Sequence, residues 1–83
     1  MKILILGATE RTGKLILVEA LNKGYYIHCL VREPNKIVEN HKNHKNHKIY
    51  KGSPEQVADL ENAIQGCKGI ISLFSYSEAV LYF

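Results

Sequence analysis

Short apolar runs alternate with segments of helical or turn character along this chain, and this alternation most strongly limits its fold. The runs are partly β-branched and cover residues 2–6, 26–31, 49–51 and 69–74. Continuous apolar runs of this length are typical of strands buried on both faces, as in parallel sheets. The resulting order β-α-β-α-β-α-β predicts an α/β protein with a parallel sheet and helices on its faces.

The segment after the first run carries helix signals over residues 13–23. Thr9 or Thr12 is the predicted N-cap, because a hydroxyl can accept a hydrogen bond from a free backbone N–H of the first turn. Gly24 follows at the position that glycine favours after a helix C-terminus. The apolar residues that recur at helical spacing, and that we expect to face the sheet, are Leu15, Val18 and Leu21, and Ile16 and Leu17 widen this apolar face.

Two further segments carry start signals. Residues 53–56 (SPEQ) have the form of a capping box, which predicts a helix that begins after Ser53 and ends at Gly66. Pro34 suits the first position of a short turn or helix after the second run. Together with the runs, these segments complete the alternating order.

Length and charge narrow the class of protein. The chain has 83 residues and a net charge of +3, and no apolar run approaches the roughly 20 residues of a membrane span. Met1 and Lys2 lead straight into the first apolar run without a cleavage site, so we expect no secretory signal. The basic surplus is concentrated in one tract and does not indicate nucleic-acid binding. Cys29 and Cys67 match neither C-x-x-C nor a zinc spacing, which favours free thiols in the cytoplasm.

The basic tract, residues 40–48, repeats His, Lys and Asn and lacks apolar residues. We expect a solvated loop there. Its imidazoles at His41, His44 and His47 would share one face of a helix, but Asn and His are poor helix formers and the tract contains no Cys or carboxylate. We therefore predict no metal site.

The loop between the first run and the first helix, residues 7–13 (GATERTG), is the strongest functional signal. Backbone N–H groups at a helix N-terminus bind phosphate when glycines let the ligand approach. The loop is not a P-loop, because its second glycine comes one residue late and Leu15, without a hydroxyl, follows Lys14. It fits a dinucleotide fingerprint better, with Gly7 in the tight turn and Gly13 allowing close helix–strand packing.

Three segments resemble the atypical short-chain dehydrogenases of the NAD(P)H-binding, NmrA-like and biliverdin reductase B-like group. Residues 7–13 resemble its GATGxTG loop, residues 30–34 (LVREP) its LVRxP segment, and residues 66–72 (GCKGIIS) its GCDxVIS strand. The resemblance implies half of a Rossmann domain over residues 1–75, with strand order 3-2-1-4 and a dinucleotide across the carboxyl ends of the strands. The positions implied to contact it are Gly7, Thr9, Glu10, Arg11, Thr12, Gly13, Arg32, Ser53, Leu73, Phe74 and Ser75.

Arg32 favours NADP(H) over NAD(H). NAD-specific sites place an acidic residue about 20 residues after the glycine loop to hold the ribose 2′-hydroxyl, whereas a guanidinium suits the 2′-phosphate of NADP. Lys36 is placed to assist. Glu33 is a predicted partner of Arg32 that would weaken this preference.

Three residues depart from the family pattern. Glu10 replaces the glycine that lets the backbone approach the pyrophosphate, and we expect it to weaken binding by roughly one to two orders of magnitude. Ser53 replaces an aspartate near the adenine, and Phe74 is bulkier than the usual residue at the strand end.

The family's substrate-binding half has no counterpart in these residues. No Tyr-x-x-x-Lys pair and no nucleophile–base pair is recognisable, so we assign no catalytic residue and leave enzymatic activity open. We expect residues 76–83 to form an apolar tail that begins the next helix, and the exposed edge of the fourth strand to promote self-association. The chain is predicted to be an NADPH-dependent reductase fragment with weak or no catalysis; the alternatives are a non-catalytic dinucleotide sensor and an inert truncated product.

Overall fold

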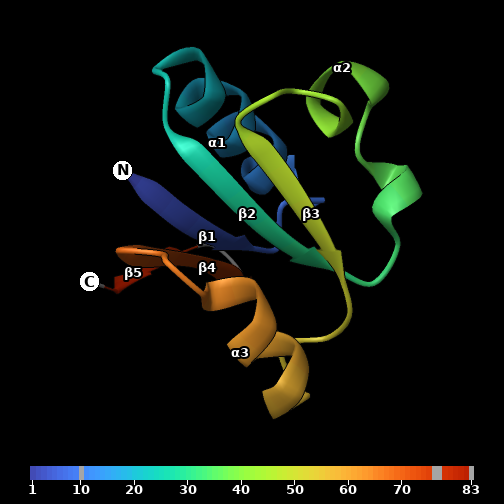
Figure 1. The fold of residues 1–83 in the computed structure, drawn as a ribbon, viewed down its shortest axis with the longest axis vertical. Coiled ribbons are helices and arrows are strands. Elements are labelled where there is room, and N and C mark those ends of the chain that lie inside the picture. Colours follow the sequence, from blue (N-terminus) through green and yellow to red (C-terminus); the bar gives the residue numbers. More distant parts are fainter. Residues whose placement is uncertain (10, 76–77, 83) are drawn as a thin grey trace.

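A computed structural model describes residues 1–9, 11–75 and 78–82 of the chain. Strands and helices alternate over most of its length (Figure 1). In chain order the elements are β1 (Lys2–Leu6), α1 (Arg11–Asn22), β2 (Tyr26–Val31), the 3₁₀ helix η1 (Pro34–Lys36), α2 (Glu39–Lys42), β3 (His47–Lys51), α3 (Val57–Ile64), β4 (Gly69–Ser75) and β5 (Glu78–Tyr82).

The sheet has the order β3-β2-β1-β4-β5, and its first four strands are parallel. This confirms the predicted α/β class and the strand order 3-2-1-4. Ile5 on the central strand aligns with Cys29 on one side and with Ile71 on the other. Parallel pairing brings the carboxyl ends of β1, β2 and β3 to one edge, where the loops that follow them meet.

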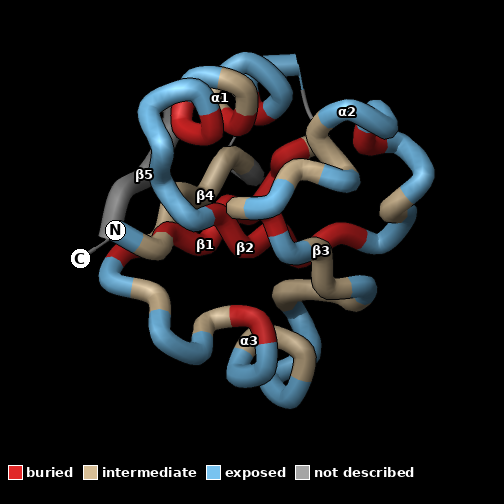
Figure 2. Tube along the Cα trace, turned by 45° about the horizontal axis from the view of Figure 1, so that its top comes forward, coloured by how far each residue is buried: buried red, intermediate tan, exposed pale blue. Residues whose placement is uncertain are grey.

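Helices cover both faces of the sheet (Figure 2). Ile3 and Ile5 of β1 belong to the core beneath α1, whereas Leu4 and Leu6 belong to the core beneath α3. Leu4 and Ile5 are fully shielded from solvent. The first apolar run is therefore buried on both faces, as its lack of polar alternation predicted.

The first helix buries only part of the predicted apolar face. Leu17 and Leu21 are buried as predicted, together with Gly13 and Ala20, whereas Leu15 is 69% exposed. Thr12 lies inside the helix and is not its cap. Gly24 follows the helix with φ of +84°, which confirms its predicted role at the C-terminal end.

The capping box at Ser53 does not form. Residues 53–56 make a turn, and α3 starts only at Val57, with no side-chain hydrogen bond from Gln56 at its N-cap. The Ser53 hydroxyl instead accepts a hydrogen bond from the backbone N–H of Glu55, two residues on, at 3.3 Å. This local bond competes with helix formation and delays the helix start.

The histidine tract is more ordered than a solvated loop. Part of it forms α2, and His47 begins β3 with its side chain buried. His47 is buried because both ring nitrogens find partners: Nδ1 donates to the His41 carbonyl at 2.6 Å, and Nε2 lies 3.0 Å from Cys29 Sγ. Among the described residues, no group of three or more His, Cys, Asp or Glu is placed to hold a metal ion.

The segment after β4 also differs from expectation. Residues 78–82 form β5, antiparallel to β4, where we expected the start of a helix. Pairing of Ser72 with Val80 covers the β4 edge that was predicted to be exposed. Within the residues that the structure describes, no helix has both the length and the apolar character needed to span a bilayer.

Candidate nucleotide-binding site

Two glycines shape the turn between β1 and α1. Gly7 has φ of +89°, a conformation that side-chain-bearing residues rarely adopt. A Cβ on Gly13 would collide with the carbonyl oxygen of Gly7, so α1 can pack this closely only because Gly13 has no side chain. Both roles agree with the dinucleotide fingerprint, and they bring the first turn of α1 directly over the end of β1.

The N-terminus of α1 supplies backbone N–H groups next to this turn. Thr9 lies half-buried in the turn, and Arg11 and Thr12 are exposed in the first helical turn. Orphan N–H groups and the positive end of the helix dipole favour an anion here. Glu10 lies outside the described residues.

A cavity of about 350 Å³ opens at the carboxyl edge beside this turn. It is lined by Gly7 and Thr9 after β1, by Arg32 at the end of β2, by Gly52 after β3 and by Lys36 of η1. The strand order therefore brings together residues that are far apart in sequence. This is the crevice at which open parallel sheets bind their ligands.

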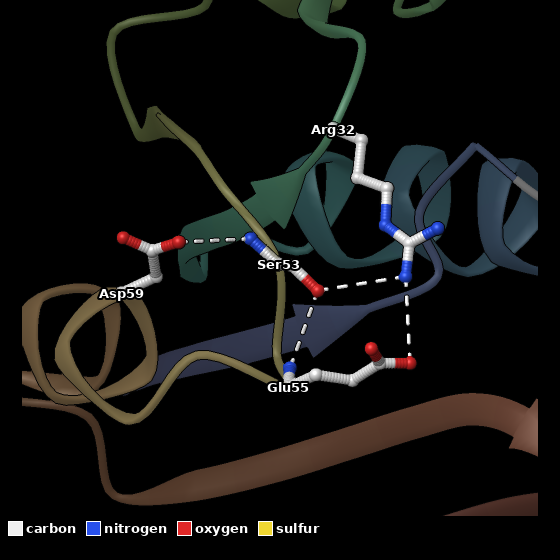
Figure 3. Close-up of polar contacts among 4 residues, drawn as sticks. All are labelled: Arg32, Ser53, Glu55 and Asp59. Carbon is white, nitrogen blue, oxygen red and sulfur yellow. Dashed lines mark hydrogen bonds and ion pairs between the residues drawn. The ribbon is translucent and has the colours of Figure 1, made fainter.

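Arg32 reaches from the end of β2 toward the loop between β3 and α3 (Figure 3). Its Nη2 lies 3.5 Å from the Ser53 hydroxyl and 3.5 Å from Oε1 of Glu55. Ser53, predicted as a contact residue, is thus placed beside Arg32. Glu55 was not predicted as part of the site, and only its position two residues after Ser53 could have indicated it.

The predicted pairing of Arg32 with Glu33 is wrong. Glu33 pairs with Lys36, at 3.8 Å from Nζ, because a residue three positions on lies on the same side of the short helical turn. Lys36 thus lines the cavity as expected, with a carboxylate partner of its own.

Asp59 of α3 holds the loop that carries Ser53, and sequence reasoning missed it. Its Oδ2 accepts a hydrogen bond from the Ser53 backbone N–H at 3.1 Å (Figure 3). Gly52 lies so close to Asp59 that a side chain there would meet the carboxylate. The only signal in the sequence was an acidic residue in the first turn of a predicted helix.

Of the three contact residues predicted at the end of β4, the structure describes the side chain of Leu73 only. Leu73 packs against the core beneath α1 and lies under Gly7, where an added Cβ would come within 3.0 Å of Leu73 Cβ. Phe74 and Ser75 continue the backbone of β4. Their side chains are outside the described residues.

The structure does bring one thiol and one imidazole together, at Cys29 and His47. Both are buried in the sheet, and burial raises the pKa of Cys29 to about 12. Burial also lowers the pKa of His47, so the pair is a neutral thiol and a neutral imidazole at pH 7. Among the described residues, the lining of the cavity contains no cysteine or histidine.

Comparison with known proteins shows the family of this chain. A model of the NAD(P)H-binding family matches residues 7–79. A dihydroflavonol 4-reductase from Gerbera hybrida is 30% identical over 75 residues, which cover 83% of this chain and 20% of that enzyme. The chain belongs to the NAD(P)H-binding family.

Solved structures agree with the fold. A Rossmann-fold NAD(P)-binding family protein from Shigella flexneri superposes with a TM-score of 0.78 at 25% identity, over 87% of this chain and 36% of that one. A short-chain dehydrogenase/reductase from Veillonella parvula in complex with NADP superposes with a TM-score of 0.81 at 20% identity, over 86% of this chain and 34% of that one. The chain thus spans about a fifth of the reductase and about a third of these structures. The predicted resemblance to NAD(P)H-binding reductases is confirmed.

Proposed function

We propose that this chain binds NADP(H) in preference to NAD(H) and forms the nucleotide-binding part of a reductase. The observation that carries the proposal is the position of Arg32 on the cavity at the carboxyl edge, beside Gly7 and Lys36. A planar guanidinium can donate paired hydrogen bonds to the 2′-phosphate of NADP, and the acidic residue next to it in the sequence, Glu33, pairs with Lys36.

The residues around the cavity fit the parts of such a ligand. The turn at Gly7 and the first turn of α1 would hold the pyrophosphate, with Gly13 allowing the helix to approach. Arg32 and Lys36 would hold the 2′-phosphate, and Ser53 lies next to Arg32 on the adenosine side. When bound, NADPH supplies a hydride, and these residues bind and orient the dinucleotide.

The proposal also covers the location of the chain, its partners and the extent of its nucleotide-binding unit. We infer a reducing cytoplasmic location from the free thiols of Cys29 and Cys67, and a dinucleotide, with no nucleic acid, as the partner. Self-association was expected at the β4 edge; because β5 pairs with that edge, we propose it instead at β5, which lies at the end of the sheet. Residues 1–75 remain the proposed nucleotide-binding unit.

Calorimetric titration with NADPH and with NADH, each up to millimolar concentration, tests the proposal. We expect tighter binding of NADPH, and we expect Arg32→Ala to weaken NADPH binding about tenfold or more while NADH changes little. Lys23→Ala, which removes an exposed cation just after α1, is the matched control. Equal affinities for both dinucleotides would overturn the NADP preference, and absence of binding to either would overturn the proposed function.

A further inference from the structure

Both cations that line the cavity are already paired with carboxylates of the chain itself. Arg32 pairs with Glu55 at 3.5 Å, and Lys36 pairs with Glu33 at 3.8 Å. An anionic ligand therefore does not meet two free positive charges. It has to compete with carboxylates that already occupy them.

The pair between Arg32 and Glu55 joins two different strand ends. Arg32 directly follows β2, and Glu55 belongs to the loop after β3 (Figure 3). The loop is held in place at two points: Glu55 donates its backbone N–H to the Ser53 hydroxyl, and Ser53 donates its own N–H to Asp59. The Glu55 carboxylate is thus presented to the guanidinium by an organised turn.

The Ser53 hydroxyl completes this arrangement. It lies 3.5 Å from the same Nη2 atom that faces Glu55. One nitrogen of the guanidinium is therefore shared between a hydroxyl and a carboxylate oxygen. A phosphate monoester bound to Arg32 would need the same donor and would carry about two negative charges close to Glu55.

We propose that Glu55 is a specificity-determining residue that competes with the 2′-phosphate for Arg32 and so reduces the preference for NADP(H) over NAD(H). This inference rests on the proposed function. The two side chains are 67% and 80% exposed, so their ion pair is weak and a dianion can displace it. The competition therefore lowers NADPH affinity several-fold without abolishing binding. NADH carries no 2′-phosphate and does not need the guanidinium.

The test is Glu55→Gln, with dissociation constants for NADPH and NADH measured by calorimetry at low ionic strength. Glutamine removes the charge and keeps the backbone N–H that donates a hydrogen bond to the Ser53 hydroxyl. We expect NADPH to bind about 3–10-fold more tightly and NADH to change by less than about twofold. Glu39→Gln is the matched control, since it removes the same charge from a pair with Lys42, 3.9 Å apart, and should leave both constants unchanged.

Glu55→Ala is a second variant, and it should give the same selective gain, because the lost charge and not the new side chain is responsible. An unchanged NADPH constant in both variants, or an equal gain for NADPH and NADH, would overturn the inference while the proposed function stands. If the wild-type chain and both variants bind neither dinucleotide, the proposed function fails and the inference fails with it. Melting curves of each variant verify that the fold is retained.

Discussion

The carbonyl oxygen of Gly7 occupies the space in which a side chain on Gly13 would begin. The first turn of α1 therefore packs against the turn after β1 with no room for a side chain between them. We expect Gly13→Ala to lower the free energy of unfolding by about 1–3 kcal/mol, because backbone on both sides must move apart. It should also weaken dinucleotide binding, since the N–H groups of α1 shift. Thermal melting and NADPH titration measure the two effects.

Gly24→Ala is the control for that prediction. Gly24 has a positive φ but open space around its Cβ position, so alanine there should cost about 1 kcal/mol from backbone strain and leave binding unchanged. Equal losses of affinity in the two variants would contradict a specific role for the contact between Gly7 and Gly13.

Asp59 fixes the turn that presents Ser53. We expect Asp59→Ala to lower the free energy of unfolding by about 1 kcal/mol, since the Ser53 N–H loses a charged acceptor in a half-exposed setting. Asp59→Asn, which retains an acceptor oxygen, should lose less. Urea unfolding measures both, and Glu61→Ala on the same helix, at an exposed position, should have almost no effect. A loss in Glu61→Ala as large as that in Asp59→Ala would argue against a specific anchor.

His47 makes stability depend on pH. Burial lowers the pKa of its imidazole in the folded chain below the usual value of 6.5, so the unfolded chain binds the proton more tightly. Its contribution to stability is complete above about pH 6.5 and is lost as the pH falls from there toward and through the folded-state pKa. Protonation also places a second N–H against the Cys29 thiol, where an acceptor was needed.

Urea unfolding at pH 7.5 and pH 5.5 tests this prediction. We expect the wild-type chain to lose stability at the lower pH, and His47→Gln to lose less over the same interval. His41→Gln should keep most of the acid sensitivity, because it retains the backbone carbonyl that contacts His47 and removes only a nearby like charge that adds to the lowering of the His47 pKa. The same acid sensitivity in His47→Gln would refute the assignment.

Glu10 is predicted from the sequence to oppose the pyrophosphate. We expect Glu10→Gly to tighten binding of both NADPH and NADH, by roughly one to two orders of magnitude, because bulk and like charge are removed from the loop. The gain should be equal for the two dinucleotides, in contrast to the selective gain expected for Glu55→Gln. Calorimetric titration measures it, and unchanged affinities would show that the carboxylate does not oppose the ligand.

The strands could be predicted from the sequence because burial on both faces leaves an uninterrupted apolar run, as in residues 2–6. The buried face of α1 could be predicted only in part, because Leu17 and Leu21 are buried as expected but Leu15 is exposed. Four consecutive apolar residues, 15–18, leave the rotation of the helix undecided, and it is set by the contact of Gly13 with Gly7, which turns Leu15 outward. The periodicity of apolar residues within the helix does not contain that contact with the preceding turn.

The candidate site, like the fold, could be predicted only in part. Gly7, Gly13 and Arg32 follow fixed offsets from the strand ends, and the parallel topology brings those ends together. Glu55 and Asp59 were missed because their roles depend on how the loop after β3 folds back, and the capping pattern at Ser53 pointed to a different hydrogen bond. The burial of His47 similarly required Cys29 as a neighbour, on a strand 18 positions away.

The central position of β1 in the sheet implies that the two ends of the candidate site, the turn at Gly7 and Lys36 of η1, differ in how readily they unfold locally. β1 has strands on both sides and helices over both faces, so the amide protons of Leu4 and Ile5 should be among the slowest to exchange with deuterated solvent. Neither η1 nor α2 contains a buried residue, and only Ile37 between them reaches the core, so the amide protons of these two short helices should exchange early. The turn at Gly7 is therefore attached to the most protected part of the chain, and Lys36 to one of the least protected. In the proposed binding mode, NADP(H) released through local opening would come free at its ribose phosphate first and at its pyrophosphate last.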